Sequence, residues 1–336
     1  MSLLRLKVNL GLFPKTSRFE KNRQQVISDY HNFLDYSDSE ELERFEYLSK
    51  YLDSSEFDEF KNDPETDPHD VVALKKEFAH IKKSKQLKHY LKNKANISRF
   101  IPLMTWRLQF EDNFDDKQLD TERWLPRYFW GDKVLNRGYS LWGDQQCLTE
   151  GDNISLSDSK LVIETRPEKK AGLAWNPVAG FVPTEFPYTS GTVNTGKSFR
   201  FTYGKIEAKV KVPKGKAYHA FWLAGEGALP QINIFSYVKG KFYLGNFWGK
   251  LNEASSVSHD ITALTGAFAG KSFIFSLEWA KKRLTWAING VPMKTMTLGI
   301  PNKPMYIAFG SGVKNRKRSL NHPVKLEIDW VRYYSK

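Results

Sequence analysis

The chain has 336 residues, 40% of them hydrophobic, which is enough to build one large core and one smaller one. Its single cysteine, Cys147, excludes an intramolecular disulfide and a cysteine metal cluster, and no apolar run is long enough to cross a membrane. The formal net charge of +13 falls almost entirely on residues after position 100.

Residues 1–100 are rich in charge and show the spacing of amphipathic helices rather than of strands. Apolar residues recur three or four positions apart at Ile27, Tyr30 and Leu34, and again at Leu42, Phe45, Leu48 and Leu52. Ser39, Ser54 and Ser84 each precede an apolar residue by three positions and an aromatic residue by six. Because serine is a favoured N-cap, we predict helices that begin at these serines, with a break at Pro64 and Pro68.

Residues 101–336 carry the alternation of apolar and polar residues that is typical of strands with one buried face, for example at 204–213 and 325–334. Asn289 and Gly290 stand between two such runs and are a strong hairpin signal. Many short, aromatic-rich strands without a helical run predict a mostly β fold, a two-sheet antiparallel sandwich of the jelly-roll type. We therefore divide the chain into a helical N-terminal region, 1–100, and a β domain, 101–336.

The β domain carries motifs in a recognisable order. They are LQFEDNFDDKQLDTERW at 108–124, DNISLSDSKLVIET at 152–165, YTSGTVNTGKSFRFTYGKIEAKVKVPKGKAYHAFW at 188–222, QINIFS at 231–236, SFIFSLEW at 272–279, AINGVP at 287–292 and KLEIDWVRYY at 325–334. In this order they resemble glycoside hydrolase family 16. The resemblance implies a concanavalin A-like jelly roll and a carbohydrate partner of the β-glycan type.

The active-site strand of that family reads E-x-D-x-x-E, and the matching stretch here is QINIFS. Gln231 stands at the position of the nucleophile, Asn233 at that of the central aspartate and Ser236 at that of the acid/base. A retaining glycosidase needs two carboxylates about 5 Å apart. An amide cannot form the glycosyl ester intermediate, and a serine cannot supply a proton at neutral pH. We therefore predict a catalytically silent relative in which the amides still hydrogen-bond a sugar.

The spacing of the three positions also predicts local geometry. On a regular strand, residue 236 would point away from residues 231 and 233, so we expect a β-bulge near Ile234 and Phe235. Two other interpretations stay open. One is an active β-glycan hydrolase or transglycosylase that uses other residues, for which Glu226 in the loop AGEGALP is a candidate. The other is a scaffold that acts through a protein partner of the N-terminal helices while the cleft is idle.

A sugar cleft needs flat aromatic side chains, on which the C–H face of a pyranose ring packs. Trp130 and Trp142 lie in an aromatic-rich segment, Trp248 follows the altered strand, and Tyr218 stands where the family has a tryptophan. We predict these four residues as carbohydrate-binding. Trp222 and Trp279 are instead predicted to lie in the core.

The basic β domain suits an acidic or sulfated polysaccharide, with VKNRKRS at 313–319 as a basic patch, whereas no motif indicates nucleic acid. No cofactor is expected except calcium, which the resemblance implies on the convex face at the position of Asp329. One aspartate supplies only part of such a site. The first residues, LLRLKVNLGLF, are broken by Arg5, Lys7 and Asn9 and do not form a secretion signal, which predicts a cytoplasmic protein without a membrane partner.

Overall fold

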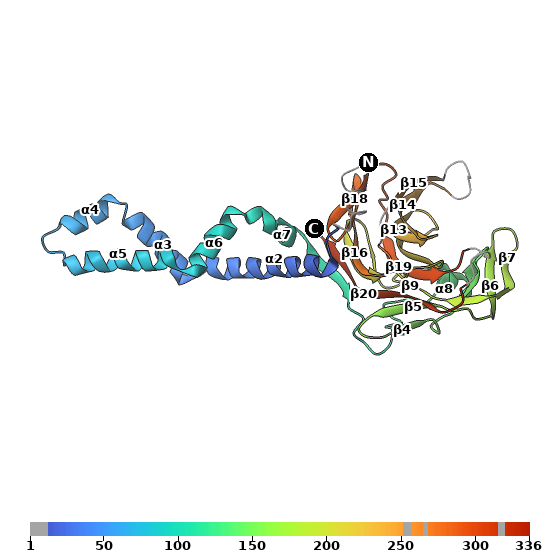
Figure 1. Ribbon diagram of the computed structural model, residues 1–336. Coiled ribbons are helices and arrows are strands. Elements are labelled where there is room, and N and C mark those ends of the chain that lie inside the picture. Colours follow the sequence, from blue (N-terminus) through green and yellow to red (C-terminus); the bar gives the residue numbers. More distant parts are fainter. Residues whose placement is uncertain (1–12, 251–256, 265–267, 315–319) are drawn as a thin grey trace. The chain divides into compact units, whose positions relative to one another are not determined.

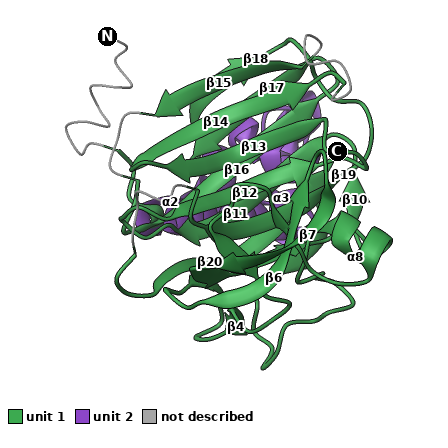
Figure 2. Cartoon of the chain, turned by 90° about the vertical axis from the view of Figure 1, so that its right-hand side faces the viewer, with its two compact units in different colours: residues 1–16, 107–336 green, residues 17–106 purple. Residues whose placement is uncertain are grey.

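The computed structural model describes residues 13–250, 257–264, 268–314 and 320–336. The chain divides into a helical unit, 17–106, and a sandwich unit, which comprises the described residues of 1–16 and 107–336 (Figure 2). The helical region predicted for 1–100 therefore starts and ends later in the structure. The N-terminal segment joins the sandwich because Phe13 packs edge-on against Phe268, with ring centroids 5.2 Å apart, and the Pro14 carbonyl accepts a hydrogen bond from Asn289 at 2.8 Å.

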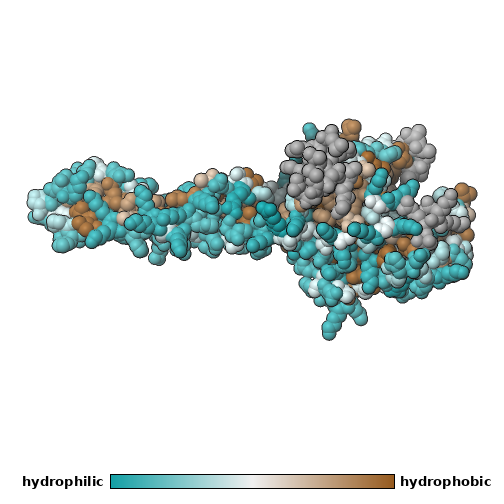
Figure 3. Space-filling model, in the orientation of Figure 1, coloured by the Kyte–Doolittle hydropathy of each residue, from teal (hydrophilic) through white to brown (hydrophobic). Residues whose placement is uncertain are grey.

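The helical unit has a hydrophobic cluster of its own. Its helices are α2 (Thr16–Ser37), α3 (Glu40–Tyr51), α4 (Ser55–Asn62), α5 (Pro68–Lys83), α6 (Lys85–Ala95), the 3-10 helix η1 (Ile97–Phe100) and α7 (Ile101–Thr105) (Figure 1). The buried cluster consists of Tyr36, Leu42, Leu48, Ile81, Leu87 and Tyr90. The face of this unit seen in Figure 3 is mainly hydrophilic, with smaller hydrophobic areas. A protein partner for this unit stays a prediction.

The three predicted N-caps are confirmed. The side chain of Ser39 accepts a hydrogen bond from the backbone N–H three residues on, at 3.2 Å, and Ser54 and Ser84 do the same at 3.2 and 3.0 Å. Each bond satisfies one of the backbone donors that a helix leaves open at its start. The predicted break is confirmed as well, since α4 ends before Pro64 and α5 begins with Pro68, whose fixed φ suits a first helical position.

Two large antiparallel sheets form the sandwich. Its elements are β1 (Arg107–Asp112), α8 (Phe129–Leu135), β2 (Ser140–Leu141), β3 (Gln146–Leu148), β4 (Ile154–Leu156), β5 (Leu161–Thr165), β6 (Lys170–Asn176), β7 (Gly180–Phe186), β8 (Tyr188–Ser190), β9 (Thr192–Asn194), β10 (Arg200–Phe201), β11 (Gly204–Lys211), β12 (Tyr218–Ala224), β13 (Gln231–Val238), β14 (Lys241–Trp248), β15 (Ser258–Leu264), β16 (Ser272–Ala280), β17 (Arg283–Ile288), β18 (Val291–Met296), β19 (Met305–Gly312) and β20 (Val324–Ser335). One sheet has the order β18-β17-β16-β11-β20-β5-β4, with β1 also on β20. The other has the order β10-β19-β12-β13-β14-β15, with β9 also on β19. The predicted fold class, a mostly β sandwich preceded by helices, is confirmed.

Local sequence signals account for much of this sheet structure. The predicted hairpin joins β17 to β18, and its turn residues Asn289 and Gly290 have φ values of 47° and 74°. Positive φ at both central positions is what a type I′ turn requires, and asparagine followed by glycine tolerates it best. The motif at 152–165 folds into the antiparallel pair β4 and β5.

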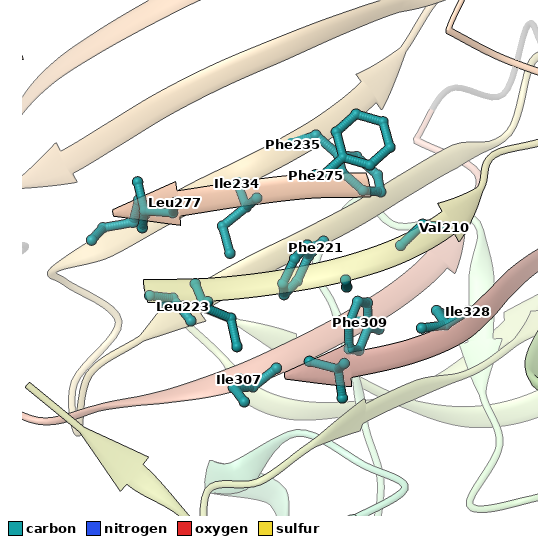
Figure 4. Packing of buried hydrophobic residues seen from close by; sticks show 14 of the residues in the cluster. Val210, Phe221, Leu223, Ile234, Phe235, Phe275, Leu277, Ile307, Phe309 and Ile328 are labelled. Carbon is teal, nitrogen blue, oxygen red and sulfur yellow. The ribbon is translucent and has the colours of Figure 1, made fainter. Parts of the chain in front are cut away.

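The core between the two sheets is built from aromatic and branched side chains of both (Figure 4). Phe221 stacks on Phe309 with ring centroids 4.5 Å apart, and Phe235 meets Phe275 of the opposite sheet at 4.6 Å. All four rings are essentially inaccessible to solvent. Such interdigitated packing is the main stabilising term of a sandwich.

His219 is buried beside this core and stays neutral. Its Nδ1 lies 2.8 Å from the Ser311 hydroxyl, and its ring stacks on Tyr237. Burial lowers the pKa of His219 from 6.5 to about 3. The unfolded chain therefore takes up a proton as the pH falls below 6.5, while the folded protein does not. The contribution of the neutral His219 to the free energy of unfolding is therefore complete above pH 6.5 and is lost progressively as the pH falls towards 3.

We expect this group to lower the free energy of unfolding by up to about 1.4 kcal/mol for each pH unit below 6.5. Urea denaturation at pH 7.5, 6 and 5 measures the slope of the free energy of unfolding against pH. The variant His219→Gln should flatten it, whereas the exposed His322→Gln should keep the slope of the wild type. A His219→Gln protein with an undiminished slope would show that other groups cause the acid sensitivity.

Candidate functional site

The site is organised by a bulge in β13. Between Asn233 and Ser236, three steps along β13 oppose two steps along β14, so β13 carries one extra residue. Ile234 and Phe235, although adjacent, are both buried in the core cluster. Ser236 is thereby returned to the face that carries Gln231 and Asn233. The predicted bulge is confirmed, at the predicted residues.

The three positions that the resemblance assigns to catalysis carry amides and a hydroxyl. Gln231 Nε2 donates a hydrogen bond to Asn233 Oδ1 at 2.7 Å, and the backbone carbonyl of Asn233 accepts one from the indole of Trp286 at 2.9 Å. Asn233 and Ser236 are only 8% and 7% exposed, whereas Gln231 is half-buried. Gln231 is thus the member of the set that is most available to a ligand.

A pocket of about 210 Å³ opens next to Gln231. Its lining combines aromatic, amide and small side chains from α8, β2, β3, β9, β12, β13 and β19 and from loops next to them. The lining residues are Tyr128, Trp130, Leu141, Asp144, Gln146, Leu148, Thr192, Asn194, Tyr218, Trp222, Ala224, Ala228, Gln231, Tyr306, Ala308, Gly310, Ser311 and Lys314. Aromatic walls with polar side chains between them can both pack against a small molecule and orient it by hydrogen bonds.

Trp222 is a wall of this pocket, and its predicted place in the core was wrong. Its neighbours on β12, Phe221 and Leu223, are fully buried in the core, so the alternation of the strand turns Trp222 to the other face. Its ring lies against Gly310, where a Cβ atom would come within 3.2 Å of it. Trp279, which was also predicted to be core, is buried there.

The pocket brings together only some of the predicted sugar-binding residues. Trp130 and Tyr218 line it together with Gln231. Trp142 is 58% exposed and is not among the lining residues. Trp248 packs on the core cluster and against Gly299, because it falls on the core-facing side of β14. Its neighbour Phe247 lies opposite Gln231 instead.

Asp144 is a pocket carboxylate that the sequence did not single out. Burial raises the pKa of Asp144, and the nearby charge of Lys314 and a hydrogen bond from the Leu141 N–H oppose that rise. The Lys314 ammonium lies 4.1 Å from the centre of the Tyr218 ring, within cation–π range. The only sequence signal for Asp144 was its place directly after the aromatic-rich segment.

Glu226, the candidate for relocated catalysis, is held in ion pairs outside the pocket. Its two carboxylate oxygens each lie 2.6 Å from a cation, Lys133 on one side and Arg200 on the other. Hydrogen bonds from both lower the pKa of Glu226, so it stays ionised at neutral pH. The backbone carbonyl of Glu226 accepts a hydrogen bond from the Trp130 indole at 2.8 Å. Glu226 therefore supports a pocket wall and does not reach the pocket as a proton donor.

The remaining predictions concern metal, charge and membrane. The described residues contain no group of three or more His, Cys, Asp or Glu side chains that could hold a metal ion, so Asp329 alone does not supply the oxygen ligands of calcium, and a calcium site stays a prediction. Of the basic tract at 313–319, residues 315–319 lie outside the described residues. None of the helices in the described ranges is both long and apolar enough to cross a membrane.

Comparison with known proteins identifies the class to which this sandwich and pocket belong. The model of glycosyl hydrolases family 16 matches residues 139–332. The chain therefore belongs to glycosyl hydrolase family 16. The match spans β2 to β19 and most of β20, and so includes the bulged strand and most of the pocket lining.

By their names, the curated relatives are a glucan endo-glucosidase, an endo-glycanase and a glucan-binding protein. Glucan endo-1,3-beta-glucosidase A1 of Niallia circulans is 22% identical over 68% of this chain and 37% of its own length. Endo-1,3-1,4-beta-glycanase EglC of Rhizobium meliloti is 23% identical over 67% of this chain and 51% of its own. Beta-1,3-glucan-binding protein 1 of Manduca sexta is 23% identical over 55% of this chain and 44% of its own length. The chain thus spans between about a third and a half of the length of these relatives.

Solved structures support the fold. The catalytic domain of an endo-1,3-beta-glucanase from Thermotoga petrophila superposes with a TM-score of 0.54 at 24% identity, covering 69% of this chain and 98% of that one. A LamA variant from Zobellia galactanivorans, in complex with laminaritriose and laminaritetraose, gives a TM-score of 0.54 at 22% identity. The superposition covers 68% of this chain and 98% of that one. These similarities concern the sandwich unit's fold.

Proposed function

We propose that this protein binds a β-glucan oligosaccharide in the pocket beside Gln231 and does not cleave it. Two features of the pocket support binding. Trp130 and Trp222 offer flat apolar surfaces to sugar rings, and Gln231 offers an amide that donates and accepts hydrogen bonds. The relatives named above are a glucan endo-1,3-beta-glucosidase, an endo-1,3-1,4-beta-glycanase and a β-1,3-glucan-binding protein, and they make β-glucan the first ligand to test.

The absence of cleavage rests on the chemistry of the lining. Hydrolysis with retention needs two carboxylates about 5 Å apart across the scissile bond. Among the described residues that line the pocket, Asp144 is the single carboxylate. The observation that carries the proposal is the hydrogen bond of 2.7 Å between Gln231 and Asn233, two uncharged amides at positions where the family's motif has acids.

Calorimetry and a reducing-end assay on the same protein test both halves of the proposal. We expect heat of binding with laminari-oligosaccharides and no release of reducing ends above the blank. Release of reducing ends would overturn the catalytic half and favour an active hydrolase. No heat with any neutral or sulfated β-glucan would overturn the binding half and favour an idle cleft.

The excess of basic side chains after residue 100 favours an acidic or sulfated ligand over a neutral one. A sulfated β-glucan is therefore expected to bind more tightly than the neutral glucan in low salt. The difference should shrink as the salt concentration rises, because salt screens exposed charges. Equal affinities in low salt would contradict a contribution from charge.

A further inference from the structure

A small sheet next to the pocket carries an exposed apolar row. Its strands have the order β2-β6-β7, and β6 and β7 form a hairpin on the side of the sandwich unit where α8 lies (Figure 1). Leu141 of β2 pairs with Trp175 of β6, and Trp175 pairs with Phe181 of β7. Side chains paired in this way share one face of a sheet. We call these three residues the hairpin row; Leu141 and Trp175 are 38% and 39% exposed.

Direct contacts connect the hairpin row to the pocket at two places. The centre of the Trp175 ring lies 4.9 Å from that of Phe181, and Phe181 meets Tyr139 edge-on at 5.1 Å. Tyr139 in turn lies 5.5 Å from Tyr128, which lines the pocket. Leu141 belongs to both features, because it is a member of the row and also lines the pocket. A ligand in the pocket can therefore reach the row without crossing a gap in apolar surface.

The composition of the hairpin indicates which ligand suits the row. Residues 171–184 contain no charged side chain, although 26% of the whole chain is charged. An exposed, uncharged aromatic surface on a sheet is suited to the C–H face of a sugar ring. The cavity of about 210 Å³ is smaller than the roughly 300 to 1,000 Å³ of pockets that enclose a drug-sized ligand. A longer oligosaccharide therefore has to continue outside the cavity.

We propose that a β-glucan chain held in the pocket continues over the hairpin row and packs one of its rings on Trp175. The proposal rests on the proposed function and adds a second contact site to it. Trp175 is not among the residues that line the pocket, so a ligand confined to the pocket does not touch it. Trp175 is then the residue that distinguishes long glucan chains from short ones.

Calorimetry of the full chain with laminaritriose and laminarihexaose tests the proposal. We expect the wild type to bind the hexasaccharide about 3- to 10-fold more tightly than the trisaccharide, because only the longer chain reaches Trp175. Trp175→Ala should abolish this gain and leave the affinity for the trisaccharide within about twofold, whereas Trp175→Phe keeps a flat ring and should keep most of the gain. A gain that persists in Trp175→Ala would overturn the proposal while leaving glucan binding intact. No binding of either sugar would overturn the proposed function itself.

Two further variants serve as comparisons. Trp142 is more exposed than Trp175 and its N–H donates a hydrogen bond to the Trp175 carbonyl, but it is not part of the row. Trp142→Ala should keep the full gain, and a loss equal to that of Trp175→Ala would contradict the assignment to the row. Phe247→Ala tests the other direction, because Phe247 lies opposite Gln231 on β14. A gain lost in Phe247→Ala but kept in Trp175→Ala would place the longer chain across β14 and overturn the proposal.

Discussion

Replacement of Trp222 with alanine is expected to weaken β-glucan binding by about 10- to 100-fold, which corresponds to roughly 1.4 to 2.8 kcal/mol. The ring forms a pocket wall over Gly310, and its removal takes away the apolar surface on which a sugar would pack. The fold should survive, because the ring lies on the pocket face of β12 and not in the core. Calorimetry with a laminari-oligosaccharide measures the loss.

Trp142→Ala is the matched control for this experiment. Trp142 is also a tryptophan of the sandwich unit, but it is largely exposed and lies outside the pocket lining. Its removal should change the affinity by less than about twofold. Equal losses in the two variants, or full affinity in Trp222→Ala, would mean that the ligand binds elsewhere. Thermal melts of both variants show whether a loss reflects binding or folding.

Phe235→Ala is expected to lower the free energy of unfolding by about 3 to 5 kcal/mol. The bulge directs this ring into the core, where it meets Phe221, Phe242 and Phe275. The deletion leaves a cavity between the two sheets that rigid neighbours cannot fill. Urea denaturation of the wild type and the variant gives the difference.

Phe247→Ala provides the comparison. Phe247 is half-buried on the pocket-side face of the adjacent strand, opposite Gln231. Its truncation should cost less than about 1.5 kcal/mol, since less apolar surface leaves contact. If Phe235→Ala proved as mild as Phe247→Ala, the bulge would not place residue 235 in the core, and the placement of Ser236 on the same face as Gln231 would lose its support.

Local rules predicted the parts of the fold that depend on neighbours in sequence. The N-caps at Ser39, Ser54 and Ser84 and the Asn289-Gly290 turn each follow from the backbone chemistry of a few residues. The resemblance implied that residues 231, 233 and 236 share one face, and strand geometry allows this across an odd separation only if one residue is added, which predicted the bulge. These predictions needed no knowledge of the distant strands.

Placements that depend on tertiary structure were predicted less well. Trp222 was expected in the core but lines the pocket, and Trp248 was expected in the pocket but packs on the core. A shift of one residue along a strand moves a side chain to the opposite face of the sheet. The short helix α8 was missed, since seven residues give too little periodicity. Asp144 became part of the pocket only through the packing of its segment beside β12 and β19.

The most direct measurement is a crystal structure of the full chain with a β-1,3-glucan tetrasaccharide. We expect an intact ligand with a sugar ring in the pocket against Trp222 and with Gln231 in hydrogen-bonding contact. A ligand that had been cleaved, or one whose anomeric carbon lay between two opposed carboxylates, would contradict the proposal that this family 16 protein binds glucan without hydrolysing it.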